Sequence, residues 1–88
     1  MAHIFVSGLV QGVYYRQFTQ IKAKSFGLTG WVKNLPDGRV DVMCEGEKGL
    51  ILDLIKELRV GPPSANVTGV QIEWQEYKGK FKDFKMKF

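Results

Sequence analysis

The chain has 88 residues, of which 44% are hydrophobic and 25% are charged, which suits one packed domain and excludes a disordered segment. We therefore expect a single domain over residues 1–88. The net charge of +4 permits an anionic partner without requiring one. A single cysteine excludes an internal disulfide. No apolar run reaches the roughly 20 residues of a membrane span, and patterned sequence begins at once, so we expect a cytoplasmic protein that does not enter a membrane.

Seven elements are predicted from the spacing of apolar residues along the chain. Strands alternate apolar and polar residues, whereas helices repeat their apolar residues every three or four positions. Glycine and proline mark the turns and the helix ends. In chain order, the predicted elements are a strand at 3–9, a helix at 15–26, strands at 30–35 and 39–45 around a turn at 36–38, a helix at 47–60, and strands at 66–77 and 83–88.

The predicted core comes from the faces of these elements. The second helix has the clearest apolar stripe in the chain, formed by Leu50, Ile51, Leu54, Ile55 and Leu58. In the first helix, Phe18, Ile21 and Phe26 are expected to face the core, together with Trp31 and Trp74 from the strands. The element order predicts an α+β, ferredoxin-like split βαβ sandwich: βαββαβ plus a short C-terminal strand, with two helices on one face of an antiparallel sheet. This fold hosts enzymes, RNA binders and metal carriers, so it names no function.

Several kinds of site lack the residues they need. His3 is the only histidine and Cys44 the only cysteine, so neither a histidine-based triad nor a Cys/His metal or redox site is expected. We predict no metal and no cofactor. Cys44 is expected to be a buried strand thiol and Asp37 a turn residue. The lysines at 78, 80, 82, 85 and 87 are expected to protect an edge strand from pairing with another sheet, with a binding patch as the alternative.

The stretch from Gly8 to Arg16 is the one whose physical chemistry favours an anion. The first amides of a helix have no internal partner, and the helix dipole adds about half a positive charge there. Gly12 allows the backbone to curl so that successive amides converge. Arg16 would be unfavourable in a first helical turn unless guanidinium and amides shared an anion. On these residues alone, the alternative is a plain glycine-containing connection with a solvated Arg16.

Two correctly spaced motifs resemble the acylphosphatase family. The first is Val-Gln-Gly-Val at 10–13 with Tyr15-Arg16, and the second is Gly-Leu-Thr-Gly-Trp-Val-Lys-Asn-Leu-Pro-Asp-Gly at 27–38. Glu45-Gly46 and Gly-Pro-Pro-Ser-Ala at 61–65 also match, so the resemblance covers the chain from about residue 3 to its end. The family usually has Phe before the arginine, where this chain has Tyr15.

The resemblance implies hydrolysis of acyl phosphates, which are mixed carboxylic–phosphoric anhydrides, to carboxylate and inorganic phosphate. It implies that Arg16 and the amides of the 11–16 loop hold the phosphate while Asn34 positions the attacking water. The catalytic residues would be Arg16 and Asn34, and the substrate-binding residues Gln11, Gly12, Val13, Tyr14, Tyr15 and Arg16. We expect a metal-independent monomer whose partners are a small acyl phosphate and inorganic phosphate, the latter as product and competitive ligand.

Two other functions stay open at this point. Residues 4–9 resemble the first-strand motif of RNA-recognition domains, but the strand at 39–45 has no aromatic residue on which a base could stack, so no nucleic-acid partner is expected. The second alternative is a relative that binds phosphate or a protein without turnover. The presence of both Arg16 and Asn34 argues against it. Without the resemblance, Asn34 would be interpreted as a turn-flanking residue that bonds its own backbone.

Overall fold

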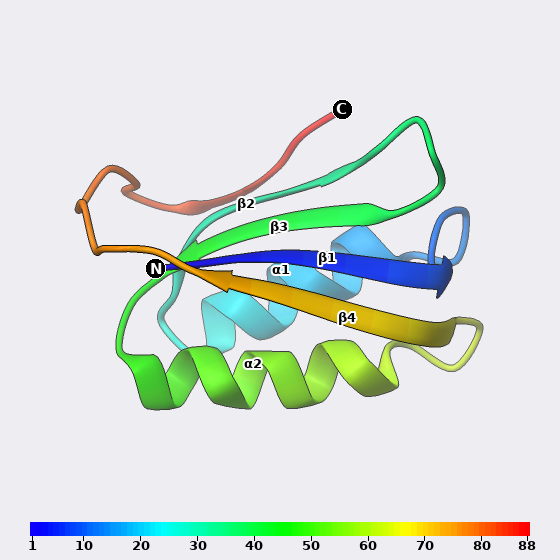
Figure 1. The fold of residues 1–88 in the computed structure, drawn as a ribbon, viewed down its shortest axis with the longest axis horizontal. Helices are drawn as coiled ribbons and strands as arrows, with labels where there is room; N and C mark the ends of the chain where they lie inside the picture. The colour runs from blue at the N-terminus through cyan, green and yellow to red at the C-terminus, as the bar shows by residue number, and fades with distance from the viewer.

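The computed structural model describes residues 1–88 and has the expected α+β architecture (Figure 1). The elements are β1 (Ala2–Leu9), α1 (Tyr15–Ser25), β2 (Thr29–Asn34), β3 (Val40–Glu45), α2 (Lys48–Val60), β4 (Asn66–Trp74) and β5 (Phe84–Met86). The five strands form one sheet in the order β4-β1-β3-β2-β5. Both helices lie on the same face of that sheet (Figure 1). The predicted ferredoxin-like plan is therefore confirmed.

The sheet is mixed and not wholly antiparallel. β1 pairs antiparallel with β3 and β4, and β2 pairs antiparallel with β3, but β5 lies parallel to β2. The chain leaves β4 at one edge, crosses the end of the sheet through residues 75–83 and returns in the opposite direction along the other edge. Because β2 also runs opposite to β4, the returning strand is parallel to its neighbour. The prediction of an antiparallel sheet is wrong for this strand only.

The core lies between the helices and one face of the sheet. Ala2, Ile4 and Val6 of β1 are fully buried on this face, as the alternation predicts. The apolar stripe of α2 is confirmed, since Ile51, Leu54, Ile55 and Leu58 are all buried. Cys44 is also fully buried, and burial raises the pKa of its thiol to about 12. The thiol therefore stays protonated at neutral pH and has no nucleophilic role.

The predicted core faces of α1 and of the tryptophans are partly wrong. α1 buries Tyr15, Thr19 and Ala23, whereas the Ile21 side chain is 61% exposed. The small side chains of Thr19 and Ala23 suit a close approach to the sheet, and the Thr19 hydroxyl donates to the Tyr15 carbonyl oxygen at 2.9 Å, so it is not left unpaired. Trp74 is 45% exposed, at the end of β4. Hydrophobicity alone therefore does not identify the buried face of α1, which includes the small side chains of Thr19 and Ala23.

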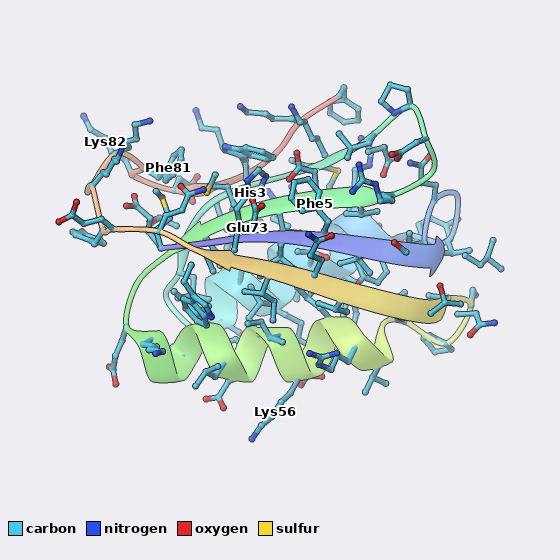
Figure 2. The ribbon with its side chains drawn as sticks, in the orientation of Figure 1. His3, Phe5, Lys56, Glu73, Phe81 and Lys82 are labelled. Atoms are coloured by element: carbon cyan, nitrogen blue, oxygen red, sulfur yellow. The ribbon has the colours of Figure 1, made fainter.

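The other face of the sheet carries no helix. His3, Phe5 and Glu73 lie on it (Figure 2). Trp31 also belongs to this face, because it pairs with Met43 opposite His3 and its ring stands edge-on to the His3 ring, with centroids 6.1 Å apart. His3 Nε2 hydrogen-bonds to Asp41 Oδ1. Neither α1 nor α2 has the length and apolar character needed to cross a membrane.

The turn between β2 and β3 has the chemistry predicted for it. Asp37 accepts hydrogen bonds from the Arg39 amide at 3.0 Å and from Arg39 Nε at 2.8 Å. These bonds from the backbone and side chain of Arg39 lower the pKa of the Asp37 carboxyl. The turn lies at the same end of the molecule as the loop between β1 and α1 (Figure 1), which places the two predicted motifs next to each other.

Candidate active site

The loop between β1 and α1 has an unusual backbone. Gly12 has a φ of 74°, and Tyr14, the residue before α1, has φ 62° and ψ 24°. A left-handed conformation costs a non-glycine residue about 1–2 kcal/mol, so it persists only where the surroundings impose it. Two left-handed residues separated by Val13 give the alternation found in anion-binding nests. Strain of this kind clusters at functional sites.

The amides of this loop are free to bind a ligand. None of the backbone amides from Gly12 to Arg16 donates a hydrogen bond within the protein. α1 has no side-chain cap and no acidic residue in its first turn. Several donors and the positive end of the helix dipole are therefore left for an external acceptor, which suits an anion.

Gln11 fixes the loop to the rest of the fold. Its Nε2 donates to the carbonyl oxygens of Leu35 at 2.8 Å and Arg39 at 2.9 Å, which flank the turn between β2 and β3. The side chain is thus used for positioning and is not available to a substrate. The sequence predicted Gln11 as part of the phosphate cradle, without this bridge.

An open pocket of about 480 Å³ lies beside the loop. It brings together five of the predicted site residues, Gly12, Tyr14, Tyr15, Arg16 and Asn34. Gln11 and Val13 do not line it. Val10, Gln17 and Met86 do, and the sequence analysis missed them. Met86 lines the pocket because β5 lies parallel to β2, an arrangement that no local sequence pattern indicates. Val10 and Gln17 directly flank the predicted binding residues 11–16, so extending that range by one residue at each end would have found them.

The C-terminal segment contacts and orients the Arg16 side chain. Its Nη1 donates to the Lys87 carbonyl oxygen at 2.9 Å, and its guanidinium carbon lies 4.7 Å from the centroid of the Phe88 ring. Arg16 forms no ion pair with a carboxylate of the protein. Its charge is therefore uncompensated, and several of its donors remain for a ligand.

Asn34 contributes an unsatisfied acceptor. Its Oδ1 is buried and has no hydrogen-bond partner, and it is the only buried side-chain polar atom in this state. Such an atom costs about 1–3 kcal/mol of folding free energy. The alternative interpretation, in which this side chain bonds its own backbone, does not account for that oxygen.

Tyr15 joins the site to the core. Its hydroxyl donates to the Leu58 carbonyl oxygen at 2.6 Å, near the end of α2. Burial raises the pKa of this hydroxyl well above its ordinary value, so the hydroxyl does not ionise at neutral pH. The hydroxyl that distinguishes Tyr15 from the usual Phe therefore ties the start of α1 to the end of α2.

Comparisons with known proteins agree with this geometry. The acylphosphatase family model matches residues 2–86. An acylphosphatase of Pelotomaculum thermopropionicum is 46% identical over 87 residues, which is 99% of this chain and 95% of that protein. An acylphosphatase of Pyrobaculum calidifontis is 50% identical over 84 residues, which is 94% of this chain and 76% of that protein.

The chain belongs to the acylphosphatase family. It is therefore related to hydrolases, and the resemblance seen in its motifs is confirmed. The crystal structure of acylphosphatase from Bacillus subtilis superposes with a TM-score of 0.96 at 32% identity, covering 99% of this chain and 97% of that one. The agreement includes the fold as well as the sequence.

The pocket offers binding and polarisation but few groups for other chemistry. No three His, Cys, Asp or Glu side chains lie together where they could bind a metal ion. Neither histidine nor cysteine lines the pocket. What it offers is free amides, the guanidinium of Arg16 and the carboxamides of Asn34 and Gln17, which can hold an anion and orient a neutral molecule next to it.

Proposed function

We propose that this acylphosphatase-family chain hydrolyses acyl phosphates to a carboxylate and inorganic phosphate. The observation that carries the proposal is that Asn34, whose Oδ1 is buried and has no hydrogen-bond partner, lines the same pocket as Arg16. A site that only bound phosphate would gain nothing from an empty acceptor, because phosphate oxygens are themselves acceptors. An acceptor is what a water molecule needs if it is to be held beside the phosphate.

The phosphate is held by the loop amides and Arg16. Charge-assisted hydrogen bonds of this kind contribute a net stabilisation of about 1.5–3 kcal/mol each. The free amides of Gly12 to Arg16 suit three phosphate oxygens, and the helix dipole adds to the attraction. Because Lys87 already orients the guanidinium, little ordering is left to occur when the substrate binds.

The attacking water is held by Asn34. Its carboxamide accepts one hydrogen bond and donates others, so it orients the water without removing a proton. The water oxygen forms a bond to phosphorus while the bond from phosphorus to the carboxylate oxygen breaks. The carboxylate leaves with the bonding electron pair, and the water proton passes to a phosphate oxygen. Acyl phosphates have a good leaving group and a loose transition state, so positioning and charge stabilisation supply the catalysis.

The mechanism needs no metal ion and no second copy of the chain. A monomeric state stays a prediction that the molecular mass in solution would test. Inorganic phosphate, as product, competes for the same amides. A cytoplasmic location stays a prediction that cell fractionation would test.

Hydrolysis of benzoyl phosphate in the presence of a chelator tests the proposal. We expect release of benzoate and phosphate, competitive inhibition by inorganic phosphate, and no loss of rate on chelation. Phosphate binding without hydrolysis would leave only a binding function. Activity that disappears with the chelator and returns with a divalent cation would refute metal independence.

A further inference from the structure

A second pocket lies at the edge of the sheet, on the opposite side of β5 from the Arg16 pocket. It measures about 360 Å³ and is lined by Gly30, Trp31, Lys80, Phe81, Lys82, Asp83, Lys85 and Lys87. We refer to it as the lysine pocket. Alternate residues of a strand point to opposite faces, so Met86 reaches the Arg16 pocket while Lys85 and Lys87 reach this one. The two pockets therefore share a strand but no lining residue.

The lysine pocket has an uncompensated positive charge. Four of its eight lining residues are lysines, and none of these forms an ion pair with a carboxylate of the protein. Asp83 is the only acid that lines it. The Asp83 Oδ1 accepts a hydrogen bond from the Phe84 amide at 2.8 Å and lies 3.9 Å from Lys24 Nζ. The Asp83 carboxylate is therefore paired with a lysine that does not line the pocket. An anion entering this pocket meets attraction from several sides.

An aromatic surface accompanies the lysines. Lys87 Nζ lies 4.6 Å and Lys33 Nζ 5.0 Å from the centroid of the Trp31 ring. Phe81 contributes a second ring from the loop between β4 and β5 (Figure 2). An exposed contact between an ammonium and a ring is weaker than the stacking of a nucleobase on tryptophan. A planar ring system could thus displace a lysine from Trp31, and the released ammonium could then pair with a phosphate.

The loop that carries Lys80, Phe81 and Lys82 is fixed at its base. The buried carboxylate of Glu45 accepts hydrogen bonds from the amides of Lys78 at 2.9 Å and of Gly79 and Lys80 at 3.0 Å. The backbone is then held in place while the lysine side chains stay exposed. Four of the five lysines that the sequence suggested as edge protection, all except Lys78, line this concavity.

We propose that the lysine pocket binds a nucleoside triphosphate, with the base stacked on Trp31 and the phosphates among Lys80, Lys82 and Lys85. Its volume suits one small ligand and is at the lower end of the range for such sites. The ring and the lysines together distinguish a nucleotide from an inorganic anion. The pocket is local to one end of the sheet, which favours a single nucleotide over an extended polyanion. This binding is separate from the proposed hydrolysis.

Fluorescence titration of Trp31 with ATP tests the proposal. The Trp74→Phe background leaves Trp31 as the only tryptophan, and excess inorganic phosphate keeps the Arg16 pocket occupied. We expect saturable quenching that phosphate does not prevent. Lys82→Gln should weaken binding about threefold and Lys82→Gln/Lys85→Gln about tenfold, as expected for exposed charge pairs. Lys56→Gln on α2, whose side chain points away from the sheet, is the matched control and should change nothing (Figure 2).

Each contrary result overturns a defined part of the proposal. No quenching by ATP would refute the site. An equal effect of Lys56→Gln and Lys82→Gln would reduce the binding to general attraction by net charge. Equal affinity for tripolyphosphate would remove the role of the ring. Tighter binding of octathymidylate or of a glutamate-rich peptide would replace the nucleotide by an extended polyanion. Benzoyl phosphate hydrolysis should be unchanged in Lys82→Gln, so failure here is distinguishable from failure of the proposed function.

Discussion

The two pockets on either side of β5 both carry positive charge, but they hold it differently. In the Arg16 pocket, the guanidinium bonds the Lys87 carbonyl, Gln11 bridges the loop to a distant turn, and the amides belong to the backbone. In the lysine pocket, the charges sit at the ends of flexible side chains, and only the base of the loop is fixed, through Glu45. Preorganised donors can stabilise a transition state, whereas flexible ones must first be ordered. We therefore assign the proposed catalysis to the first pocket and only the proposed binding to the second.

Arg16→Ala should give the largest effect, because it removes the one fixed charge of the Arg16 pocket. We expect turnover of benzoyl phosphate to fall about a thousandfold and phosphate binding to be lost. Steady-state kinetics and calorimetric titration with phosphate measure the two effects. Arg59→Ala, at an exposed position on α2, is the control and should keep both. If Arg16→Ala still turned over normally, the fixed guanidinium would not be what separates the two pockets.

Asn34→Ala should separate binding from turnover. We expect the rate to fall by at least about a hundredfold while phosphate still binds, because the proposed mechanism has the carboxamide hold water and not the phosphate. Asn66→Ala, at an exposed position on β4, is the control. A parallel loss of phosphate affinity would indicate that Asn34 holds the substrate itself.

Asn34→Leu probes the same atom through stability. Removing a buried acceptor without a partner relieves a cost of about 1–3 kcal/mol, so this variant should unfold in urea at or above the wild-type midpoint. A clear loss of stability would mean that Oδ1 has a partner in solution that contributes to the fold.

Gln11→Met tests whether the bridge to the turn is what fixes the loop. The variant keeps the length of the side chain and loses both donated hydrogen bonds. We expect kcat/KM to fall about tenfold, corresponding to about 1.4 kcal/mol of transition-state stabilisation. The control is Gln71→Met, at an exposed position on β4. Equal kinetics in the two variants would show that the loop needs no bridge.

Glu45→Gln acts on the one fixed point of the lysine pocket. Burial alone would raise the pKa of Glu45, but hydrogen bonds from the amides of Lys78, Gly79 and Lys80 outweigh it and lower the pKa below its ordinary value of 4.5. A lowered folded-state pKa means that the stabilisation is complete above 4.5 and is lost as the pH falls through the folded-state pKa. The variant should therefore be less stable than wild type near neutrality.

The pH dependence of urea unfolding measures this effect. The difference between Glu45→Gln and wild type should be constant above about pH 6 and should shrink at pH values below 4.5. Glu76→Gln, in the exposed loop between β4 and β5, is the control and should follow wild type throughout. A difference that is the same at pH 3 and pH 7 would mean that the carboxylate charge does not anchor the loop.

The elements and their order could be predicted from the sequence, because each depends on local spacing and on glycine or proline. The stripe of α2 is an example, since its spacing is unambiguous. The face of α1 could not be predicted in this way, because it is defined by the small residues Thr19 and Ala23. The direction of β5 could not be predicted either, because it depends on which edge of the sheet a long crossing reaches.

The candidate site divides in the same way. The loop amides and Arg16 were indicated by helix-terminus physics, whereas Asn34 was identified only by its family resemblance. The contact between Arg16 and the Lys87 carbonyl had no signal at all, because a backbone oxygen is present at every residue. Similarly, the scattered lysines gave no hint of a concavity, which exists only once β5 lies beside Trp31.

The hydrogen bond from Arg16 to Lys87 joins residues 71 positions apart. The Arg16 pocket is therefore incomplete until β5 has docked on β2, which requires the slow closure of a long loop. A chain still emerging from the ribosome, or a collapsed intermediate without this strand, has the amides but no oriented guanidinium. Phosphate affinity should thus appear only in the last phase of folding, and added phosphate should slow unfolding without accelerating the early steps.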